Sequence, residues 1–177
     1  MKRGRLLILA VAIVVATVFV VLACLPPLYM PRVREYLPLA LEMSEAYGVD
    51  VCLVLAVANV ESAFDPHARS AAGAMGLMQL MPDTARWIAG VNGWDYAPDM
   101  LLDARYNVRS ATWYLAYLSA RFEREWALAA YNAGEGVVQR WQREGIAVDD
   151  VPYRETREYV AKVCKISNRY ARRGVSG

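Results

Sequence analysis

One carboxyl group in this chain stands where general acid–base chemistry would need it. Glu61 lies near the end of the segment Val51–Ser62 (VCLVLAVANVES), which is apolar on nearly all sides and is therefore expected to be a buried helix. Burial raises the pKa of a carboxyl group toward neutrality, and a neutral carboxyl can protonate a leaving group near physiological pH. The structural alternative is a helix end that turns back to solvent, where a glutamate is ordinary.

The elements that would position Glu61 are helices, because no segment shows the two-residue alternation of a half-buried strand. A first amphipathic helix should run to Tyr47 and end at Gly48, and Asp50 should cap the second helix. A connection rich in Gly, Asn and Pro is expected over residues 90–99. We predict further helices over residues 82–89, 104–122, 126–133, 136–143 and 155–171.

An apolar segment precedes the helical part. Residues 6–25 (LLILAVAIVVATVFVVLACL) contain no charged residue and, at about 1.5 Å per residue, are long enough for the roughly 30 Å hydrocarbon layer of a bilayer. Basic residues precede the segment, which predicts a cytoplasmic N-terminus and an extracytoplasmic remainder. We expect residues 1–25 to form an uncleaved transmembrane signal anchor. The alternative is a lipoprotein signal, in which Cys24 of the sequence VLAC is lipidated.

A short stalk and one folded domain should follow the anchor. Pro26, Pro27 and Pro31 predict a stiff stalk over residues 26–31, and residues 32–177 have the length of a single domain. Subtracting the 3 basic residues of the anchor from 20 leaves 17 Lys and Arg against 18 Asp and Glu. This near-neutral domain gives no indication of nucleic-acid binding, which needs a concentrated basic face.

Cysteine contributes little to the prediction. Outside the anchor only Cys52 and Cys164 remain, far apart in sequence and flanked by apolar residues. We expect two buried free thiols. A disulfide is the alternative that an oxidising compartment would permit.

Five short sequence motifs place Glu61 in a family context. The residue begins an ES pair at 61–62, which is followed by GLMQ at 76–79 and MPDTA at 81–85, then AYNAG at 130–134 and ETREYV at 155–160. In this order the motifs resemble the soluble-lytic-transglycosylase (SLT) domain, a branch of glycoside hydrolase family 23 related to goose-type lysozyme. The resemblance covers about residues 36–170. It implies an all-α, lysozyme-like single catalytic domain, here preceded by the N-terminal transmembrane helix.

The resemblance also implies roles for individual residues. Glu61 occupies the position of the catalytic acid and base. Tyr131 matches a tyrosine that approaches this carboxyl and the substrate N-acetyl group, and Asn132 is its neighbour in the cleft. Glu155 matches an acidic residue on the muramic acid side that is not itself catalytic.

Further residues match the walls of the family's cleft. Gln79 and Met81 match residues that flank the sugar subsites, and Ser70 matches a serine of the cleft wall. Ser70, Gln79, Tyr131 and Asn132 carry neutral donors and acceptors suited to hydroxyl and acetamido groups. We expect Gly73 and Gly76 to let the backbone approach a sugar closely, because neither has a Cβ atom.

The number of carboxyl groups separates two reactions on peptidoglycan. Hydrolysing glycosidases generally use two carboxyl groups, and the sequence offers one convincing candidate. Glu61 would protonate the oxygen between N-acetylmuramic acid and N-acetylglucosamine, and then take the proton of the C6 hydroxyl as a 1,6-anhydro ring closes. The resemblance implies this lytic transglycosylase reaction, with glycan strands as substrate and no metal ion or cofactor.

Two other interpretations of the sequence stay open. The first is a lysozyme-like hydrolase, whose product differs from that of the transglycosylase by one water molecule. The second is a catalytically idle wall-binding scaffold module. The presence of Glu61, Gln79, Tyr131 and Asn132 argues against the idle module. The sequence names no protein partner and no oligomeric state.

Overall fold

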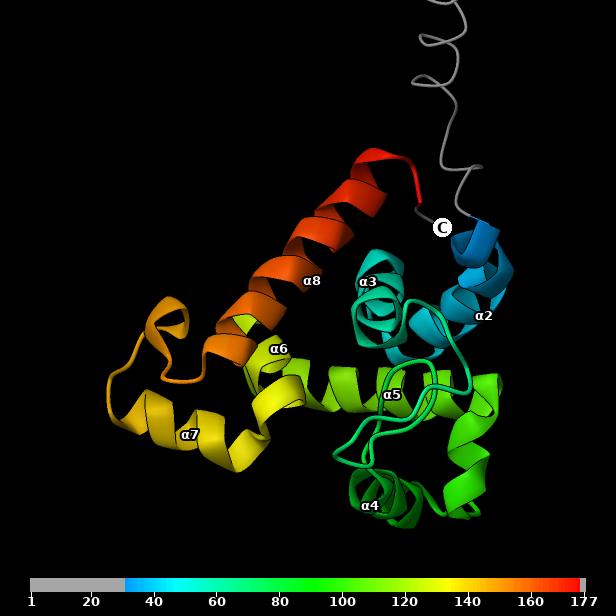
Figure 1. Ribbon diagram of the computed structural model, residues 1–177, viewed down its shortest axis with the longest axis horizontal. Coiled ribbons are helices and arrows are strands. Elements are labelled where there is room, and N and C mark those ends of the chain that lie inside the picture. The colour runs from blue at the N-terminus through cyan, green and yellow to red at the C-terminus, as the bar shows by residue number, and fades with distance from the viewer. Residues whose placement is uncertain (1–30, 176–177) are drawn as a thin grey trace, which may run out of the picture.

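The computed structural model describes residues 31–175, and within this range the chain is built from helices without a β-strand (Figure 1). Only two isolated bridges, Arg69 with Met75 and Met75 with Leu80, occur in the described part. The all-α prediction is confirmed. In chain order the elements are α2 (Pro31–Tyr47), α3 (Val51–Ser62), α4 (Pro82–Asn92), the 3-10 helix η2 (Pro98–Leu102), α5 (Ala104–Ser119), α6 (Arg124–Ala133), α7 (Glu135–Arg143), the 3-10 helix η3 (Val148–Asp150) and α8 (Arg154–Arg172).

The predicted signal anchor over residues 1–25 lies outside the described residues. So does the predicted stalk over residues 26–31, except for Pro31, which is the first residue of α2. Helix α2 thus includes Pro31, the residue before the predicted domain boundary at Arg32. None of the helices between residues 31 and 175 combines the length and the apolar character needed to cross a bilayer.

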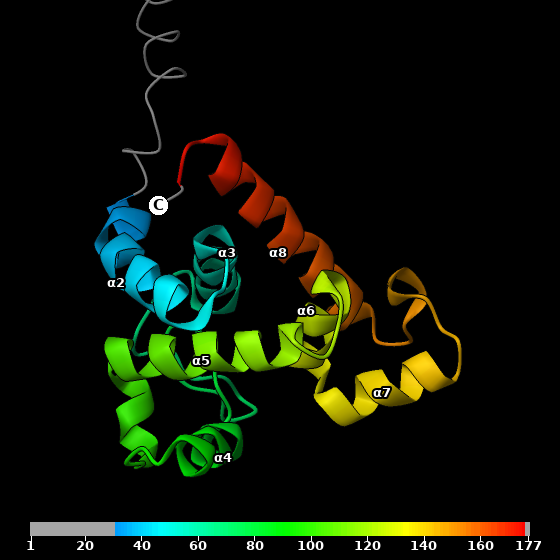
Figure 2. The same cartoon turned by 180° about the vertical axis from the view of Figure 1, so that it is seen from behind.

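Helix α3 lies in the centre of the fold and packs against α2 and α8 (Figures 1 and 2). Every residue from Val51 to Ala58 is buried, as the apolar sequence predicted. The predicted cap is also confirmed, because an Asp50 side-chain oxygen accepts a hydrogen bond from the Cys52 backbone N–H at 2.9 Å. Ala63 and Phe64 follow the helix in the left-handed conformation, with φ values of 52° and 64°. The chain therefore turns sharply just after Glu61.

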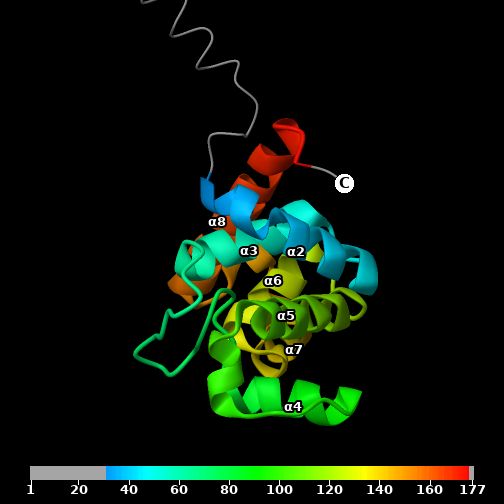
Figure 3. The ribbon, with the colours of Figure 1, turned by 90° about the vertical axis from the view of Figure 1, so that its right-hand side faces the viewer.

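Helix α8 closes the fold along α3 and α6. Its buried side chains recur every three or four residues, so one stripe of the helix faces the core and the opposite face meets solvent. Figure 3 shows the remaining layers, with α2 and α4 on opposite sides of α5. The buried stripe of α8 consists of Thr156, Tyr159, Val160, Val163, Ile166, Ser167 and Tyr170.

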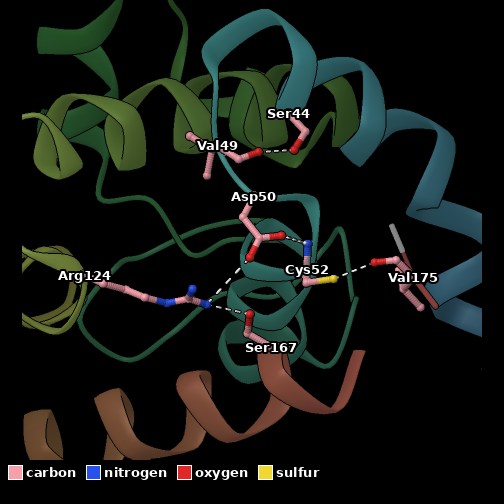
Figure 4. A network of polar contacts seen from close by, with 7 residues as sticks. All are labelled: Ser44, Val49, Asp50, Cys52, Arg124, Ser167 and Val175. Atoms are coloured by element: carbon pink, nitrogen blue, oxygen red, sulfur yellow. Dashed lines mark hydrogen bonds and ion pairs between the residues drawn. The ribbon is translucent and has the colours of Figure 1, made fainter. Parts of the chain in front are cut away.

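A polar network fastens the start of α3 to its neighbours (Figure 4). Arg124, at the start of α6, donates to the Ser167 hydroxyl of α8 at 2.7 Å and lies 3.8 Å from an Asp50 carboxylate oxygen. The Cys52 thiol donates to the Val175 carbonyl at 2.6 Å. Three helices and the chain's last described residue thus meet at one point.

Both cysteines that the structure describes are free thiols. Cys52 is buried and Cys164 is partly exposed, which confirms the free-thiol prediction and leaves only Cys164 less buried than expected. Burial raises the pKa of the Cys52 thiol to about 11, and the nearby Asp50 carboxylate adds to the shift. The Cys52 thiol is therefore protonated and unreactive at neutral pH.

The predicted bounds of α3 and the predicted end of α2 at Tyr47 were correct, whereas each of the other predicted helices differs from the structure by a few residues at one or both ends. Helix α4 continues past Gly90 to Asn92, because Gly93 with φ 66° is the residue that ends it. The following connection contains the 3-10 helix η2, which the sequence analysis did not predict. Helix α5 ends at Ser119 and not at Phe122.

Candidate active site

Glu61 lies in the last turn of α3, where the buried helix reaches the surface. The pKa of its carboxyl is raised to about 7, chiefly because burial disfavours the charged form. A long contact with the Tyr159 hydroxyl and the charge of Lys162 lower the pKa, and the carboxylate of Glu155 raises it. Among the described residues no cation pairs directly with Glu61. The predicted desolvation is confirmed, and both protonation states are populated at neutral pH.

Two tyrosine hydroxyls accompany the Glu61 carboxyl, one from α6 and one from α8. Burial raises the pKa of Tyr131 and of Tyr159 well above the ordinary value, and the Glu61 charge adds to both shifts. Both hydroxyls therefore keep their protons and cannot act as bases. The Tyr131 hydroxyl donates to the Met78 carbonyl at 2.8 Å. The buried Tyr159 hydroxyl has no partner at normal hydrogen-bond distance in the described part, so its contact with Glu61 is a long one.

The α8 residues that act on Glu61 share one face of the helix. Glu155, Tyr159 and Lys162 are spaced by four and three residues, which places them one above another. The tyrosine is buried, whereas the two charged residues are exposed. Of these three residues, only Glu155 was predicted from the sequence. The helical period of its ETREYV motif was the signal that could have found Tyr159.

The loop between α3 and α4 carries the GLMQ motif and is held by its own backbone. The Gly76 N–H donates to the Ala68 carbonyl at 2.9 Å, and Met75 and Leu80 exchange hydrogen bonds of 3.0 and 3.1 Å. Gln79 adopts a left-handed conformation with φ 48°, and its amide nitrogen donates to the Ala68 and Gly76 carbonyls. The amide hydrogens of Gln79 therefore serve the loop, which leaves its carbonyl oxygen for a ligand.

Asn107, which the sequence analysis missed, fixes this loop from inside the fold. Its fully buried amide donates to the carbonyls of Met75 and Leu101 at 2.9 and 3.0 Å and accepts from the Met78 N–H at 2.8 Å. A buried amide so completely paired positions backbone precisely because breaking any of these bonds leaves an unsatisfied polar group. An asparagine inside an amphipathic helix gave no signal in the sequence that distinguished it from a surface residue.

The expectation for Gly76 was wrong, because the close approach occurs within the protein. A Cβ atom at this position would lie 2.1 Å from the Leu101 carbonyl oxygen and 2.4 Å from the Asn107 side chain. Gly76, with φ 80°, is thus required by the packing of the loop on η2 and α5. Gly73 has open space around it, so the expected approach of a ligand there stays a prediction.

The other predicted site residues occupy different surroundings. The exposed Ser70 accepts a hydrogen bond from the Ala74 N–H at 2.9 Å, which closes a turn of the loop. The Asn132 side-chain oxygen accepts from the Thr156 hydroxyl at 2.8 Å and so joins α6 to α8. Met81 precedes α4 and is 42% exposed. The structure thus brings Tyr131 and Glu155 to Glu61. Ser70 and Gln79 hold neighbouring backbone, and Asn132 holds the Thr156 side chain.

A group of aromatic rings continues from Tyr131 toward α4. We call Trp87, Trp113, Tyr114 and Tyr117 the aromatic shelf. The Tyr131 ring lies 5.6 Å from that of Tyr114, and the Trp87 ring lies 6.1 Å from Tyr114 and 5.0 Å from Tyr117. Trp87 is 41% exposed, which is unusual for so large an apolar side chain. Next to the shelf, a hollow of about 310 Å³ is lined by Asp83, Thr84, Trp87, Tyr114 and Glu135.

Comparison with known proteins gives consistent matches. Residues 38–151 match the family described as "Transglycosylase SLT domain". Over 119 residues the chain is 41% identical to membrane-bound lytic murein transglycosylase C of Actinobacillus pleuropneumoniae. The matched segment covers 60% of this chain and 33% of that protein. The soluble lytic murein transglycosylase of Escherichia coli is 39% identical over 121 residues, which are 62% of this chain and 19% of that protein. The chain thus spans about a third or less of these relatives.

Solved structures with similar folds agree with these matches. The 70-kDa soluble lytic transglycosylase of Escherichia coli superposes with a TM-score of 0.73 at 30% identity, covering 80% of this chain and 26% of that one. An inactive mutant of the lytic transglycosylase Slt from Pseudomonas aeruginosa gives a TM-score of 0.71 at 31% identity, with 78% and 25% covered. The expected family and its fold are therefore confirmed.

Proposed function

The chain belongs to the transglycosylase SLT domain family, and from this premise we propose that it is a lytic transglycosylase that cleaves peptidoglycan glycan strands. The observation that carries the proposal is Glu61, a desolvated carboxyl with a pKa of about 7 at the end of a buried helix. The names of its relatives, lytic murein transglycosylases, support the same activity. Because the chain spans only part of these relatives, their activity comes to it as a proposal.

In the first step Glu61 acts as a general acid. Its protonated carboxyl donates to the oxygen between N-acetylmuramic acid and N-acetylglucosamine as the bond from that oxygen to the muramic acid C1 breaks. Loss of the proton leaves a carboxylate in a desolvated site, where the Tyr159 hydroxyl and the charge of Lys162 stabilise it. A pKa near the working pH suits a group that must give and then regain a proton.

In the second step the Glu61 carboxylate acts as the base. It takes the proton of the muramic acid C6 hydroxyl while that oxygen forms a bond to C1, which yields a 1,6-anhydro ring and restores the protonated carboxyl. The attacking hydroxyl belongs to the same sugar, so the step has the high effective concentration of an intramolecular reaction. The two steps consume no water.

The residues around Glu61 support binding of a glycan. Tyr131 holds α6 against the GLMQ loop through the Met78 carbonyl, so α6 and the loop keep a fixed relation. The exposed side chains of Ser70 and Met81, together with Glu155, are proposed to contact the sugar units nearest the cleaved bond. The aromatic shelf offers ring faces of the kind on which the apolar faces of sugars pack.

Membrane attachment is the second part of the proposal. The apolar residues 6–25 and the similarity to proteins described as membrane-bound support tethering of the domain. We propose a single transmembrane anchor over residues 1–25 with the catalytic domain outside the cytoplasm. Lipidation of Cys24 is the alternative, and mass spectrometry of the purified protein distinguishes the two by the mass of the attached lipid.

One observation favours a second candidate reaction. A lysozyme-like hydrolase needs another carboxyl group near the acid, and the charge of Glu155 does act on Glu61. Glu155 is exposed and lies in the first turn of α8, which is why we assign it to substrate binding. The products decide between the two reactions, because hydrolysis adds one water to the new reducing end.

The test is a digest of purified sacculi analysed by mass spectrometry. We expect 1,6-anhydromuramic acid ends from the wild-type protein and none from Glu61→Gln. Glu158→Gln, which removes an exposed carboxyl of α8, is the control and should cleave normally. Hydrated reducing ends alone would establish the hydrolase. Equal clearing by the wild type and Glu61→Gln would leave only a wall-binding module.

A further inference from the structure

A concentration of positive charge lies at one end of the molecule, away from Glu61. We propose that this end docks onto the anionic headgroups of the membrane that anchors the chain. We call it the basic end and define it by Arg32 of α2, by Lys165, Arg169 and Arg172 of α8, and by Arg173. The inference rests on the membrane attachment proposed above and adds an orientation to it.

The basic side chains share continuous surface. A hollow of about 380 Å³ is lined by Lys165, Asn168, Arg169, Arg172 and Arg173, without a carboxylate. A second hollow of about 530 Å³ joins Arg169 to Arg32 across the ends of α2, α3 and α8. Charges from both ends of the described chain therefore meet on one surface.

These cations have no carboxylate partners among residues 31–175. The six ion pairs of the described part all involve other residues. Arg32 donates one hydrogen bond, to the Ala63 carbonyl at 2.7 Å, and this contact leaves its positive charge unneutralised. The domain has nearly equal numbers of acidic and basic residues, so these cations form a local excess of positive charge that carboxylates elsewhere balance only in the total.

Helix stability explains only part of the basic end. Arg169 and Arg172 lie in the last turn of α8, where positive charge is favoured by the helix dipole. Arg32 lies in the first turn of α2, where positive charge is unfavourable, and that turn contains no acidic residue. Lys165 lies before the last turn of α8. The positions of these basic residues therefore correspond to one surface of the molecule and are not explained by the helix dipoles alone.

The position of the basic end along the chain selects the membrane as its partner. Pro31 follows the last residue of the apolar segment by six positions, and six residues span at most about 20 Å. Figure 1 places the start of α2 beside the C-terminal end of α8. The tether therefore keeps the basic end close to the lipid surface, where each Lys or Arg favours docking roughly fivefold.

The test measures docking of the full-length chain, which the apolar segment holds in any bilayer. The protein is placed in nanodiscs of neutral phosphatidylcholine or in nanodiscs that also contain phosphatidylglycerol. Backbone hydrogen exchange is followed over residues 165–175. We expect slower exchange in the anionic discs at low salt, and loss of the difference at high salt.

A matched pair of variants removes equal charge from two helix ends. The double variant Arg172→Gln/Arg173→Gln should lower the equilibrium constant for docking roughly 25-fold and abolish the lipid dependence. The control Arg140→Gln/Arg143→Gln removes two arginines at the end of α7 and should behave as the wild type. Exchange that is equal in both kinds of disc, or that changes equally in both variants, overturns the proposal.

Two further measurements separate this inference from its alternatives. Slower exchange caused by soluble polyphosphate in neutral discs, with no effect of phosphatidylglycerol, would assign the surface to an anionic polymer and refute membrane docking. The Arg172→Gln/Arg173→Gln variant should release anhydro products from soluble glycan fragments at the wild-type rate. Lipid-independent exchange together with intact cleavage would therefore reject docking while leaving the enzymatic proposal standing.

Discussion

Asp50 and Glu61 lie at opposite ends of α3, and their surroundings give the two carboxyl groups different roles. Asp50 is at the N-terminal end, where it accepts the Cys52 N–H and lies 3.8 Å from an Arg124 nitrogen (Figure 4). Glu61 is at the C-terminal end, where the helix dipole disfavours negative charge and burial raises its pKa to about 7. The Asp50 carboxylate fastens the start of α3 through its contacts with Cys52 and Arg124, whereas the Glu61 carboxyl is kept ready to exchange a proton.

The largest expected effect concerns Glu61, at the C-terminal end of α3. Glu61→Gln should lower the rate of glycan cleavage by about 10³-fold, because the amide cannot supply the proton that general acid catalysis needs. Asp50→Asn, at the other end of α3, retains a capping side chain and should keep the wild-type rate. The rate of anhydro-product release measures both. Similar losses in the two variants would show that the ends of α3 do not differ in role.

The pH dependence of stability is the second expected effect. Glu61 binds its proton more tightly in the folded state, with a pKa of about 7 against a reference of 4.5. As pH rises between these values, the free energy of unfolding should fall by up to about 3 kcal/mol and then level off. Glu61→Gln should lack this decline. Urea unfolding at several pH values checks it, and parallel curves for the two proteins would contradict the raised pKa.

A smaller effect is expected at the structural end of α3. Asp50→Ala removes the helix cap and should lower the free energy of unfolding by about 1–2 kcal/mol. Loss of the partly exposed contact with Arg124 should add little. The cleavage rate per folded molecule should not change. Thermal unfolding measured with the activity of the same sample separates the two quantities, with Asp50→Asn as the milder control.

The smallest effect concerns the second carboxyl near Glu61. Glu155→Gln removes a negative charge that raises the Glu61 pKa, so the loss of activity at high pH should begin at a slightly lower pH. Glu158→Gln should leave the profile in place. The pH dependence of kcat/KM gives the answer. Inactivation of Glu155→Gln to the level of Glu61→Gln would instead favour the two-carboxyl hydrolase.

The sequence predicted α3 well because local signals agree there. An apolar run, the capping Asp50 and the turn after Tyr47 all mark the same helix, and the structure confirms its bounds at Val51 and Ser62. The motifs predicted the family and pointed to Glu61. Tyr131 and Glu155 were also predicted, and the structure places both near this carboxyl.

Long-range contacts account for what the sequence did not predict. Asn107 acts through Met75, Met78 and Leu101, and no local pattern reports such contacts. A glycine is required at position 76 by Leu101 of η2 and Asn107 of α5, and not by a ligand. The net charge also gave no sign of the basic end, because a count of charged residues does not report where the fold places them.

Helix α8 joins the two regions on which the proposals rest. Its early turns present Glu155, Tyr159 and Lys162 to Glu61, and its last turns carry Arg169 and Arg172 of the basic end. Its 19 residues form a rod of about 28 Å. If the basic end rests on lipid, the length of α8 sets the distance between the membrane surface and Glu61. It therefore also sets the distance from the membrane at which glycan strands are cut. Strands passing at that level are within reach, and those farther out are spared.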